Sequence, residues 1–278
     1  MKFKRNSRFF LFLRTVSNNF ILEFTKHLKE AGANNIIISP THPAILLIKE
    51  GKLMIELISY NDIQNNKLIT FPNIPIGAEF IRIYEDQWNL KKEIIKSRLS
   101  SALGNNETIW ARQCKLSKIE KPQCDEFLEE NHLLGKSSSG FKYGLFHKNM
   151  LVAVAIFGKS RTMVDSAIYY RSYELIKFAN KNNVTVVGGL QKLIKNFMID
   201  KNVKHLMTYI DLEWGTGKAY KLMGFKETET TEPISYWVNQ QTNLRRKFTE
   251  EISPTKNEFK ISNLGSMKFI LDTRENGK

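Results

Sequence analysis

The segment VTVVGGLQKLIKNF, residues 184–197, constrains the fold most, because two adjacent glycines directly precede a clear helical pattern. After them, hydrophobic residues recur at the three- and four-residue spacing of one buried helix face. These residues are Leu190, Leu193, Ile194, Phe197 and Met198. Between them, Lys192, Lys195 and Asn196 point away from that face. The sequence therefore predicts a core helix entered through Gly188-Gly189.

The glycine pair has two interpretations. Glycine lets a backbone approach a ligand closely, and the first turn of a helix presents unpaired N–H groups at the positive end of its dipole. Such a helix start is suited to hold an anion, for example a pyrophosphate. Alternatively, the glycines serve a loop that needs a positive φ before a core helix.

The composition predicts a folded protein. The 278 residues, 42% of them hydrophobic, are enough for two ordinary domains or one large domain. The early hydrophobic run FFLFL, residues 9–13, lies between Arg8 and Arg14 and is too short for a secretion signal or a membrane span. Two cysteines, Cys114 and Cys124, form no disulfide framework or metal motif. We therefore expect a cytoplasmic protein that does not associate with membranes.

The charge indicates the partner class. A formal net charge of +14 and a pI near 9.6 attract polyanions, so nucleic acid is the leading candidate. A lysine-rich composition that merely follows an AT-rich genome is the alternative. The five histidines show no metal-ligand spacing.

The first hundred residues predict an α+β domain. Ser17 is a candidate cap for a helix that carries Phe20, Phe24 and Leu28. The runs AILLI and LMIEL predict a hairpin around Gly51. The run EFIRIYED predicts an alternating strand, and a helix is expected over residues 89–102. A domain boundary is expected near residues 104–107.

The pattern restarts at residue 108. In order, TIWARQCKL predicts a strand, PQCDEFLEENH a helix and KYGLFHKNMLVAVAIFG two strands joined by a turn. The segment HLMTYIDLEWG predicts a strand, GKAYKLMGF a short helix ended by Gly224, and PISYWVNQ a last strand. The C-terminal run FKISNLGSMKFILD predicts a small hairpin.

This order of elements, with YELIKFA, VVGGLQKLI and MTYIDLEWGTGKAYKLMGF, resembles the GNAT fold of acyltransferases. The resemblance implies that residues 173–178 form the splayed central strand. It also implies that Val187, Gly188, Gly189 and Leu190 form a pyrophosphate loop, with Lys192 near the phosphates. In AYKLMGF, Tyr220 is implied as the proton donor to a leaving group, although a tyrosine there also suits a helix core.

The segments FGKSR, YELIKFA, VVGGLQKLIKNF and TYIDLEWG are similar to the Mom-like branch of GNAT proteins, which modify DNA bases, and to the C-terminal module of phage homing endonucleases. This similarity implies that Lys159 and Arg161 meet phosphate. Tyr209 and Trp214 would stack on an extruded base, and Asp211 or Glu174 would accept a proton from its amine. Structural alternatives are a turn cap for Asp211, an ion pair for Glu174 and core packing for Trp214.

The segment GAEFIRIYEDQWNLKKEIIKSRLSSALG resembles the last strand and helix of Vsr-like nuclease domains. By this resemblance Glu56 and Glu85 are metal-ligand candidates, because Mg²⁺-dependent hydrolysis needs clustered carboxylates. The preceding strand AILLIK lacks the aspartate of that family, which favours a degenerate nuclease fold kept for DNA binding or packing.

Together these observations predict an α/β (α+β) protein with a restriction-endonuclease-like N-terminal mixed sheet and a GNAT-like mixed central sheet. The expected ranges are 1–105, 106–240 and a C-terminal extension, 241–278. The expected function is a phage-type, DNA-directed transferase that modifies a nucleobase amine with acetyl-CoA or a related acyl donor. The alternatives are a Mg²⁺-dependent homing-type endonuclease and a non-catalytic binder of nucleic acid or a host factor. DNA is the expected partner, and RNA remains open.

Overall fold

The computed structural model describes residues 19–39, 43–48, 50–65, 73–137, 140–165 and 167–274. The predicted cap Ser17 and the run FFLFL lie outside these residues. The chain forms two compact units, and neither is continuous in sequence. Unit 1 comprises residues 1–92, 211–216 and 232–266, and unit 2 comprises residues 93–210, 217–231 and 267–278. The three predicted ranges were contiguous, whereas these units interleave.

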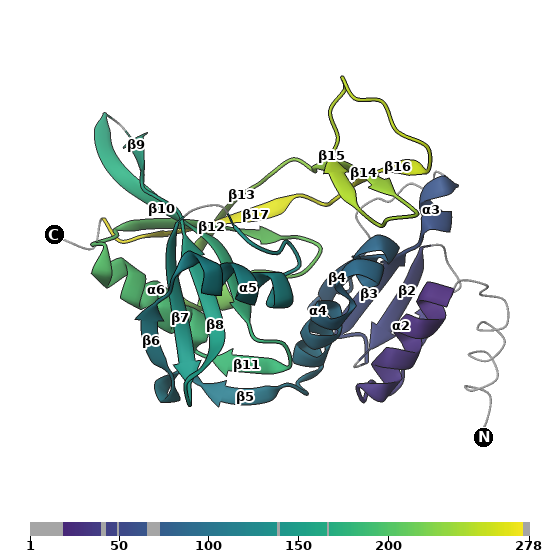
Figure 1. The fold of residues 1–278 in the computed structure, drawn as a ribbon, viewed down its shortest axis with the longest axis horizontal. Helices are drawn as coiled ribbons and strands as arrows, with labels where there is room; N and C mark the ends of the chain where they lie inside the picture. The colour runs from purple at the N-terminus through teal and green to yellow at the C-terminus, as the bar shows by residue number, and fades with distance from the viewer. Residues whose placement is uncertain are drawn as a thin grey trace. The chain divides into compact units, whose positions relative to one another are not determined.

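Unit 1 contains a four-stranded sheet in the order β1-β2-β3-β4 (Figure 1). The strands are β1 Ile37–Ser39, β2 Ala44–Ile48, β3 Leu53–Ile58 and β4 Glu79–Tyr84. β2 and β3 form the predicted antiparallel hairpin around Gly51, whereas β3 and β4 are parallel. All residues of β4 after Glu79 are buried, so the predicted alternation between a buried and an exposed face is wrong. A strand covered on both faces needs no alternation.

A second, three-stranded sheet in unit 1 has the order β15-β14-β16. Its strands are β14 Ser235–Asn239, β15 Arg245–Lys247 and β16 Glu258–Ser262. The predicted C-terminal hairpin is wrong, because β16 pairs with β14 whereas the next strand, β17 Ser266–Asp272, joins another sheet. The predicted last strand is β14, and it too lies outside the large sheet. The error at the hairpin concerns partners distant in sequence, which local patterns do not reveal.

Unit 2 is built on an eight-stranded sheet in the order β13-β17-β12-β10-β8-β7-β6, with β9 paired to β10. The strands not yet given are β6 Lys115–Lys118, β7 Phe141–His147, β8 Met150–Phe157, β9 Arg161–Asp165, β10 Ile168–Asn180, β12 His205–Asp211 and β13 Lys226–Thr230. β10 pairs in parallel with β12 and antiparallel with β8, so the sheet is mixed, as predicted. β9 and the start of β10 project from it as a two-stranded arm (Figure 1).

The predicted strand TIWARQCKL is two strands in two sheets. β5 Glu107–Trp110 pairs in parallel with β11 Val184–Val187, and β6 belongs to the large sheet. A 3₁₀ turn, η1 Ala111–Gln113, separates them, and the Gln113 side chain accepts the Trp110 N–H. That local hydrogen bond offers the backbone an alternative to a continuous strand.

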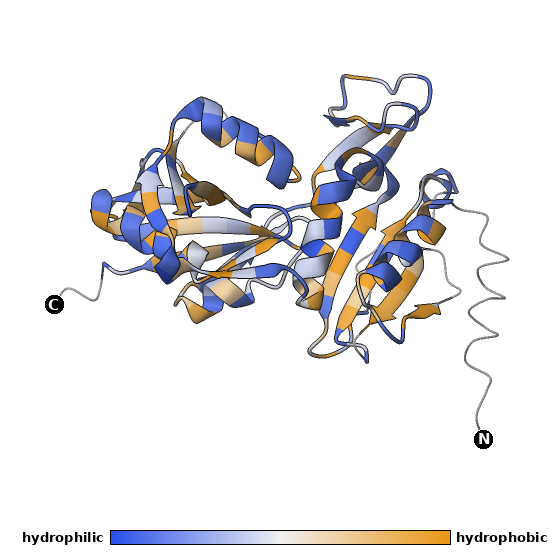
Figure 2. Ribbon diagram, turned by 60° about the horizontal axis from the view of Figure 1, so that its bottom comes forward, coloured by the Kyte–Doolittle hydropathy of each residue, from blue (hydrophilic) through white to orange (hydrophobic). Residues whose placement is uncertain are grey.

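The predicted helices are confirmed, with changed bounds. The described helices are α2 Asn19–Glu30, α3 Tyr60–Gln64, α4 Glu85–Leu103, α5 Lys121–Asn131, α6 Gly189–Asp200 and α7 Lys218–Leu222. α4 begins earlier than expected and has non-helical dihedrals at Lys91, next to the boundary between the units. Figure 2 shows hydrophobic residues concentrated on the strands and hydrophilic ones along one side of several helices. Within the described residues, no helix has the length and hydrophobicity that a membrane span requires.

The core of unit 2 is organised around Phe197 of α6. Its ring stacks on Phe157 of β8 at a centroid distance of 3.9 Å and an interplanar angle of 8°. Tyr143 and Tyr173 make edge contacts with the same ring, at 6.0 and 5.4 Å. Phe157 and Phe197 are fully buried, so this aromatic cluster holds α6 on the sheet.

We expect Phe197→Ala to lower the free energy of unfolding of unit 2 by about 3–5 kcal/mol, because it removes a fully buried ring and leaves a cavity. Ile199→Ala is the control in the same helix, since Ile199 is 83% exposed. Its effect is expected within about 0.5 kcal/mol. Urea unfolding followed by tyrosine and tryptophan fluorescence measures both, and equal effects would contradict the assigned core.

Candidate active site

The central feature of unit 2 is the point where two parallel strands part. β10 and β12 pair from Ser172 opposite His205 to Leu175 opposite Thr208. After Leu175 the register of β10 shifts by a bulge, and β10 stays paired with β8 as far as Asn180. The ladder with β12 therefore ends while β10 continues for five residues, roughly 16 Å at the usual rise of a strand.

Tyr220 reaches this point through Thr208. The Thr208 Oγ1 hydroxyl donates to the Leu175 carbonyl at 2.9 Å and is buried. The same hydroxyl lies close enough to the phenol of Tyr220, in α7, to lower the pKa of that tyrosine. The tyrosine hydroxyl is thus held at the end of the parallel ladder.

The surroundings keep Tyr220 protonated. Its ring makes an edge contact with Phe225 at 5.5 Å and lies near Phe269 at 5.9 Å. Burial raises the pKa of Tyr220 to about 12, and the hydrogen bond with Thr208 opposes this rise. At neutral pH Tyr220 is therefore a neutral phenol, which is able to donate a proton.

The two glycines at the start of α6 have different structural roles. Gly188 is exposed and has φ 76°, in the left-handed region that favours glycine. Gly189 is buried, and a Cβ there would lie 2.9 Å from Val186 Cγ1. Gly188 thus permits the turn and Gly189 the close packing. No side chain caps the helix start, so its first N–H groups are not used by a capping group.

The remaining residues of the predicted pyrophosphate loop differ in exposure. Val187 is 39% exposed, whereas Leu190 packs partly against the core. Lys192 Nζ donates to the Ala111 carbonyl at 2.9 Å and to the Cys114 carbonyl at 2.5 Å. Lys192 therefore braces the helix start against η1. Val187 and Gly188 remain on the surface.

Two of the predicted site residues, Arg161 and Glu174, form an ion pair with each other. Arg161 Nη2 lies 3.5 Å from Glu174 Oε2, on the surface beside the arm. The Gly158 N–H donates to the Glu174 carbonyl, which aligns the segment that carries Lys159 with β10. Lys159 is exposed. These cations line the base of the arm.

The other predicted residues are divided between the units. Tyr209 belongs to unit 2 and is 39% exposed, whereas Asp211 and Trp214 belong to unit 1. The Asp211 carboxylate accepts the Glu213 N–H at 2.9 Å, and its carbonyl accepts the Trp214 N–H. Asp211 is exposed and also acts as a turn cap, the structural alternative expected from the sequence.

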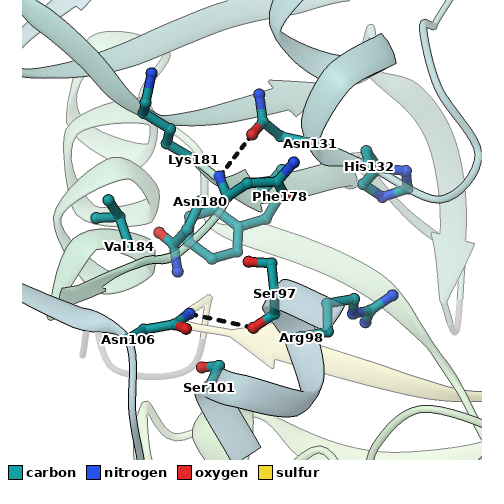
Figure 3. Close-up of a pocket in the computed structure, with 12 residues that line it drawn as sticks. Ser97, Arg98, Ser101, Asn106, Asn131, His132, Phe178, Asn180, Lys181 and Val184 are labelled. Atoms are coloured by element: carbon teal, nitrogen blue, oxygen red, sulfur yellow. Dashed lines mark hydrogen bonds between the residues drawn. The ribbon is translucent and has the colours of Figure 1, made fainter. Parts of the chain in front are cut away.

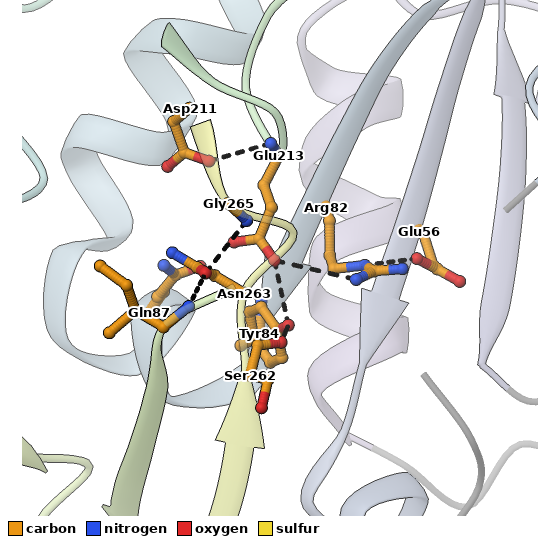
Figure 4. A network of polar contacts seen from close by, with 10 residues as sticks. Glu56, Arg82, Tyr84, Gln87, Asp211, Glu213, Ser262, Asn263 and Gly265 are labelled. Carbon is orange, nitrogen blue, oxygen red and sulfur yellow. Dashed lines mark hydrogen bonds and ion pairs between the residues drawn. The ribbon is translucent and has the colours of Figure 1, made fainter. Parts of the chain in front are cut away.

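Unit 1 contains a buried ionic network that the sequence did not reveal (Figure 4). Arg82 Nε donates to Glu56 Oε2 at 2.6 Å, and Arg82 Nη1 lies 3.8 Å from Glu213 Oε1. The Tyr84 hydroxyl donates to Glu213 Oε1 at 3.1 Å. Burial, followed by the nearby Asp211 charge, raises the pKa of Glu213 to about 8. Burial also raises the pKa of Glu56, against the opposing effect of Arg82.

The two metal-ligand candidates have other partners. Glu56 binds Arg82, and the Glu85 carboxylate accepts the Tyr60 N–H at 2.8 Å. In the part of the chain that the structure describes, no group of three histidine, cysteine or acidic residues is placed to hold a metal ion. A Mg²⁺ site is therefore not supported by the described residues.

Two contributors were missed because they resemble ordinary strand or turn residues. Thr208 sits mid-strand in MTYID, and only the parting of β10 and β12 shows its importance. Glu213 follows Asp211 in IDLEWG, and nothing local indicates that Arg82, over a hundred residues earlier, would neutralise it.

No protein-family model and no curated protein matches this chain. Solved structures similar to it are GNAT-type acetyltransferases. The ribosomal-protein-S18-alanine N-acetyltransferase from Escherichia coli has a TM-score of 0.35 at 14% identity, covering 58% of this chain and 94% of that one. A Bacillus subtilis acetyltransferase in complex with CoA has a TM-score of 0.36 at 15% identity, covering 57% and 98%. A GNAT family acetyltransferase from Elizabethkingia anophelis with acetyl-CoA bound has a TM-score of 0.33 at 13% sequence identity, and the match covers 58% of this chain and 98% of that one.

We expect Glu213 to make unit 1 less stable as the pH rises. Because the pKa of Glu213 is higher in the folded state than in the unfolded state, protonation of this carboxyl stabilises the fold. The stabilisation is fully present below the unfolded pKa near 4.5 and is lost as the pH rises through about 8. Between pH 5 and 7.5 this one group should lower the free energy of unfolding by roughly 2–3 kcal/mol.

Urea unfolding across this pH range measures the effect. Glu213→Gln should flatten the pH dependence, whereas Glu79→Gln, at an exposed position in the same unit, should leave it as in the wild type. A Glu213→Gln profile parallel to that of the wild type would contradict the assigned pKa.

Proposed function

We propose that the protein is a GNAT-fold acyltransferase that takes the acyl group from acetyl-CoA or a related thioester and transfers it to a nucleobase amine of DNA. The observation that carries the proposal is the position of Tyr220 beside Thr208, whose hydroxyl donates to the Leu175 carbonyl where β10 and β12 part. This arrangement holds a neutral phenol at the opening of a split sheet, where a leaving group needs a proton.

The residues at the start of α6 fit the phosphates of such a donor. Gly188 is exposed, and a Cβ there would meet only Ala111 Cβ, at 3.6 Å. The uncapped N–H groups and the positive end of the helix dipole favour an anion at this position. The stretch of β10 from Leu175 to Asn180 runs from the parting point to a turn, and β11 then leads from that turn to this helix.

The chemistry assigns a proton acceptor and a proton donor. The thioester supplies an electrophilic acyl carbon and a thiolate leaving group. Within unit 2, Glu174 accepts the proton that the attacking amine loses, and Tyr220 gives its proton to the departing sulfur. Glu174 pairs with Arg161 of the same unit. In this step the N–H bond of the amine and the C–S bond of the thioester break, and an amide C–N bond and a thiol S–H bond form.

DNA as the acceptor is supported by charge. The net charge of +14 favours a polyanion, and Lys159 and Arg161 stand together at the base of the arm. All residues of β9 are exposed, and Tyr169 of the arm is 74% exposed. An exposed ribbon with cations at its base and an aromatic side chain is suited to contact phosphates and bases.

We expect Tyr220→Phe to reduce the rate of base modification by about 10²–10⁴-fold, because the ring is kept and only the proton donor is lost. Mass spectrometry of nucleosides from the DNA of expressing cells detects the product. Leu222→Ala, at an exposed position of the same helix, should retain modification. A wild-type yield from Tyr220→Phe would remove Tyr220 from the mechanism, and the same test applies to Glu174→Gln.

Binding of the acyl donor can be tested separately from acyl transfer. Gly188→Asp should weaken CoA binding by tenfold or more, because the added carboxylate repels the phosphates at the helix start. Gly188→Asn is the matched control, similar in size, tolerant of positive φ and uncharged, so it should bind CoA more tightly than Gly188→Asp. Isothermal titration calorimetry compares the two. Equal affinities of the two variants for CoA would show that the phosphates of CoA do not bind at the start of α6.

A further inference from the structure

A polar cavity of about 240 Å³ lies within unit 2, apart from the residues assigned to acyl transfer (Figure 3). Its walls come from the second half of α4, from the end of α5 and from the turn after β10. The residues that the argument uses are Ser97, Arg98, Asn106, Phe178, Asn180 and Lys181. The volume is close to the lower end of the usual range for small-molecule sites.

The walls are held by their own hydrogen bonds. Ser97 Oγ accepts the Asn183 N–H at 2.8 Å, and Asn106 Nδ2 donates to the Ser97 carbonyl at 3.2 Å. On the other side, the Asn131 side chain accepts the Asn182 N–H at 2.6 Å. These contacts join α4, α5 and the turn after β10, so the cavity is preformed.

Two acceptors in these walls are unmatched. Asn106 Oδ1 and Asn180 Oδ1 are buried, and neither has a hydrogen-bond partner among the described residues. A buried carbonyl oxygen without a donor is unfavourable and uncommon in folded proteins. A ligand with N–H groups would satisfy both oxygens after small rotations of the amides.

The cationic lining residues and the Phe178 ring indicate which class of ligand the cavity can bind. The lining includes Arg98 and Lys181 but no acidic residue, so an anion is favoured. Lys181 forms no ion pair with any described residue. The Phe178 ring also lines the cavity and offers a flat surface for a planar heterocycle (Figure 3).

We propose that this cavity binds a mononucleotide unit. Its base lies on Phe178 and donates N–H groups to Asn106 and Asn180, and its phosphate lies toward Lys181 and Arg98. The unit is either a free nucleotide or one residue of a single strand, since both present the same chemistry. The proposal does not depend on acyl transfer, because binding needs no donor.

Calorimetry with the full chain, in the absence of CoA, tests the proposal. The probes are dAMP, dTMP, inorganic phosphate and a single-stranded deoxyadenosine dodecamer. We expect dAMP to bind at least tenfold more tightly than phosphate, and more tightly than dTMP, whose base has no amino group for the two asparagines. A competition experiment distinguishes the two kinds of ligand. If the dodecamer displaces dAMP, the cavity binds one residue of a single strand. If the dodecamer does not displace dAMP, the cavity binds a free nucleotide.

Variants locate the binding. Phe178→Leu keeps hydrophobic packing but removes the ring, and Lys181→Ala removes a cation, so each should weaken dAMP binding about tenfold. Lys195→Ala, on the exposed face of α6, is the control and should bind as the wild type does. Thermal unfolding confirms that each variant is folded. Binding of dAMP no tighter than phosphate, or unaffected by Phe178→Leu and Lys181→Ala, would overturn the proposal.

Discussion

The parallel ladder between β10 and β12 is only four residue pairs long, and the architecture of unit 2 depends on how it ends. A mid-sheet separation leaves backbone groups without ladder partners, so each must be satisfied in another way. Thr208 does this for Leu175 with its hydroxyl, and the bulge keeps β10 on β8. The opening is therefore a stable feature of the sheet and brings a tyrosine hydroxyl to its apex.

The two units handle buried polar groups differently. In unit 1, Arg82 is fully buried and lies between Glu56 and Glu213, and a proton on Glu213 compensates for incomplete pairing. Buried ionic groups of this kind contribute little net stability but strongly penalise the loss of one partner. In unit 2, the buried polar groups at the parting strands are neutral hydroxyls and carbonyls. A proton donor is available there without the desolvation of a charge.

Local patterns predicted local structure well. The α6 helix, the Gly51 hairpin and the short helix before Gly224 followed from periodicity and turn residues, because each is determined by neighbours in sequence. The partners of β14, β16 and β17 did not, since they are chosen among strands with similar hydrophobic patterns. At the candidate site, Tyr220 and the glycine pair were visible as motifs. Thr208 was not, because its role exists only where two distant strands part.

The placement of β17 has a consequence for how the protein is made. This strand lies between β12 and β13, and its Phe269 is fully buried, yet the chain visits the three-stranded sheet of unit 1 before returning. While the ribosome is still translating the segment before Ser266, β12 and β13 lack their shared neighbour. Their unpaired edges are then open to association with other chains. A premature stop in this late segment would leave most of the sequence synthesised but the central sheet incomplete, and aggregation rather than partial activity is the expected fate of such a product.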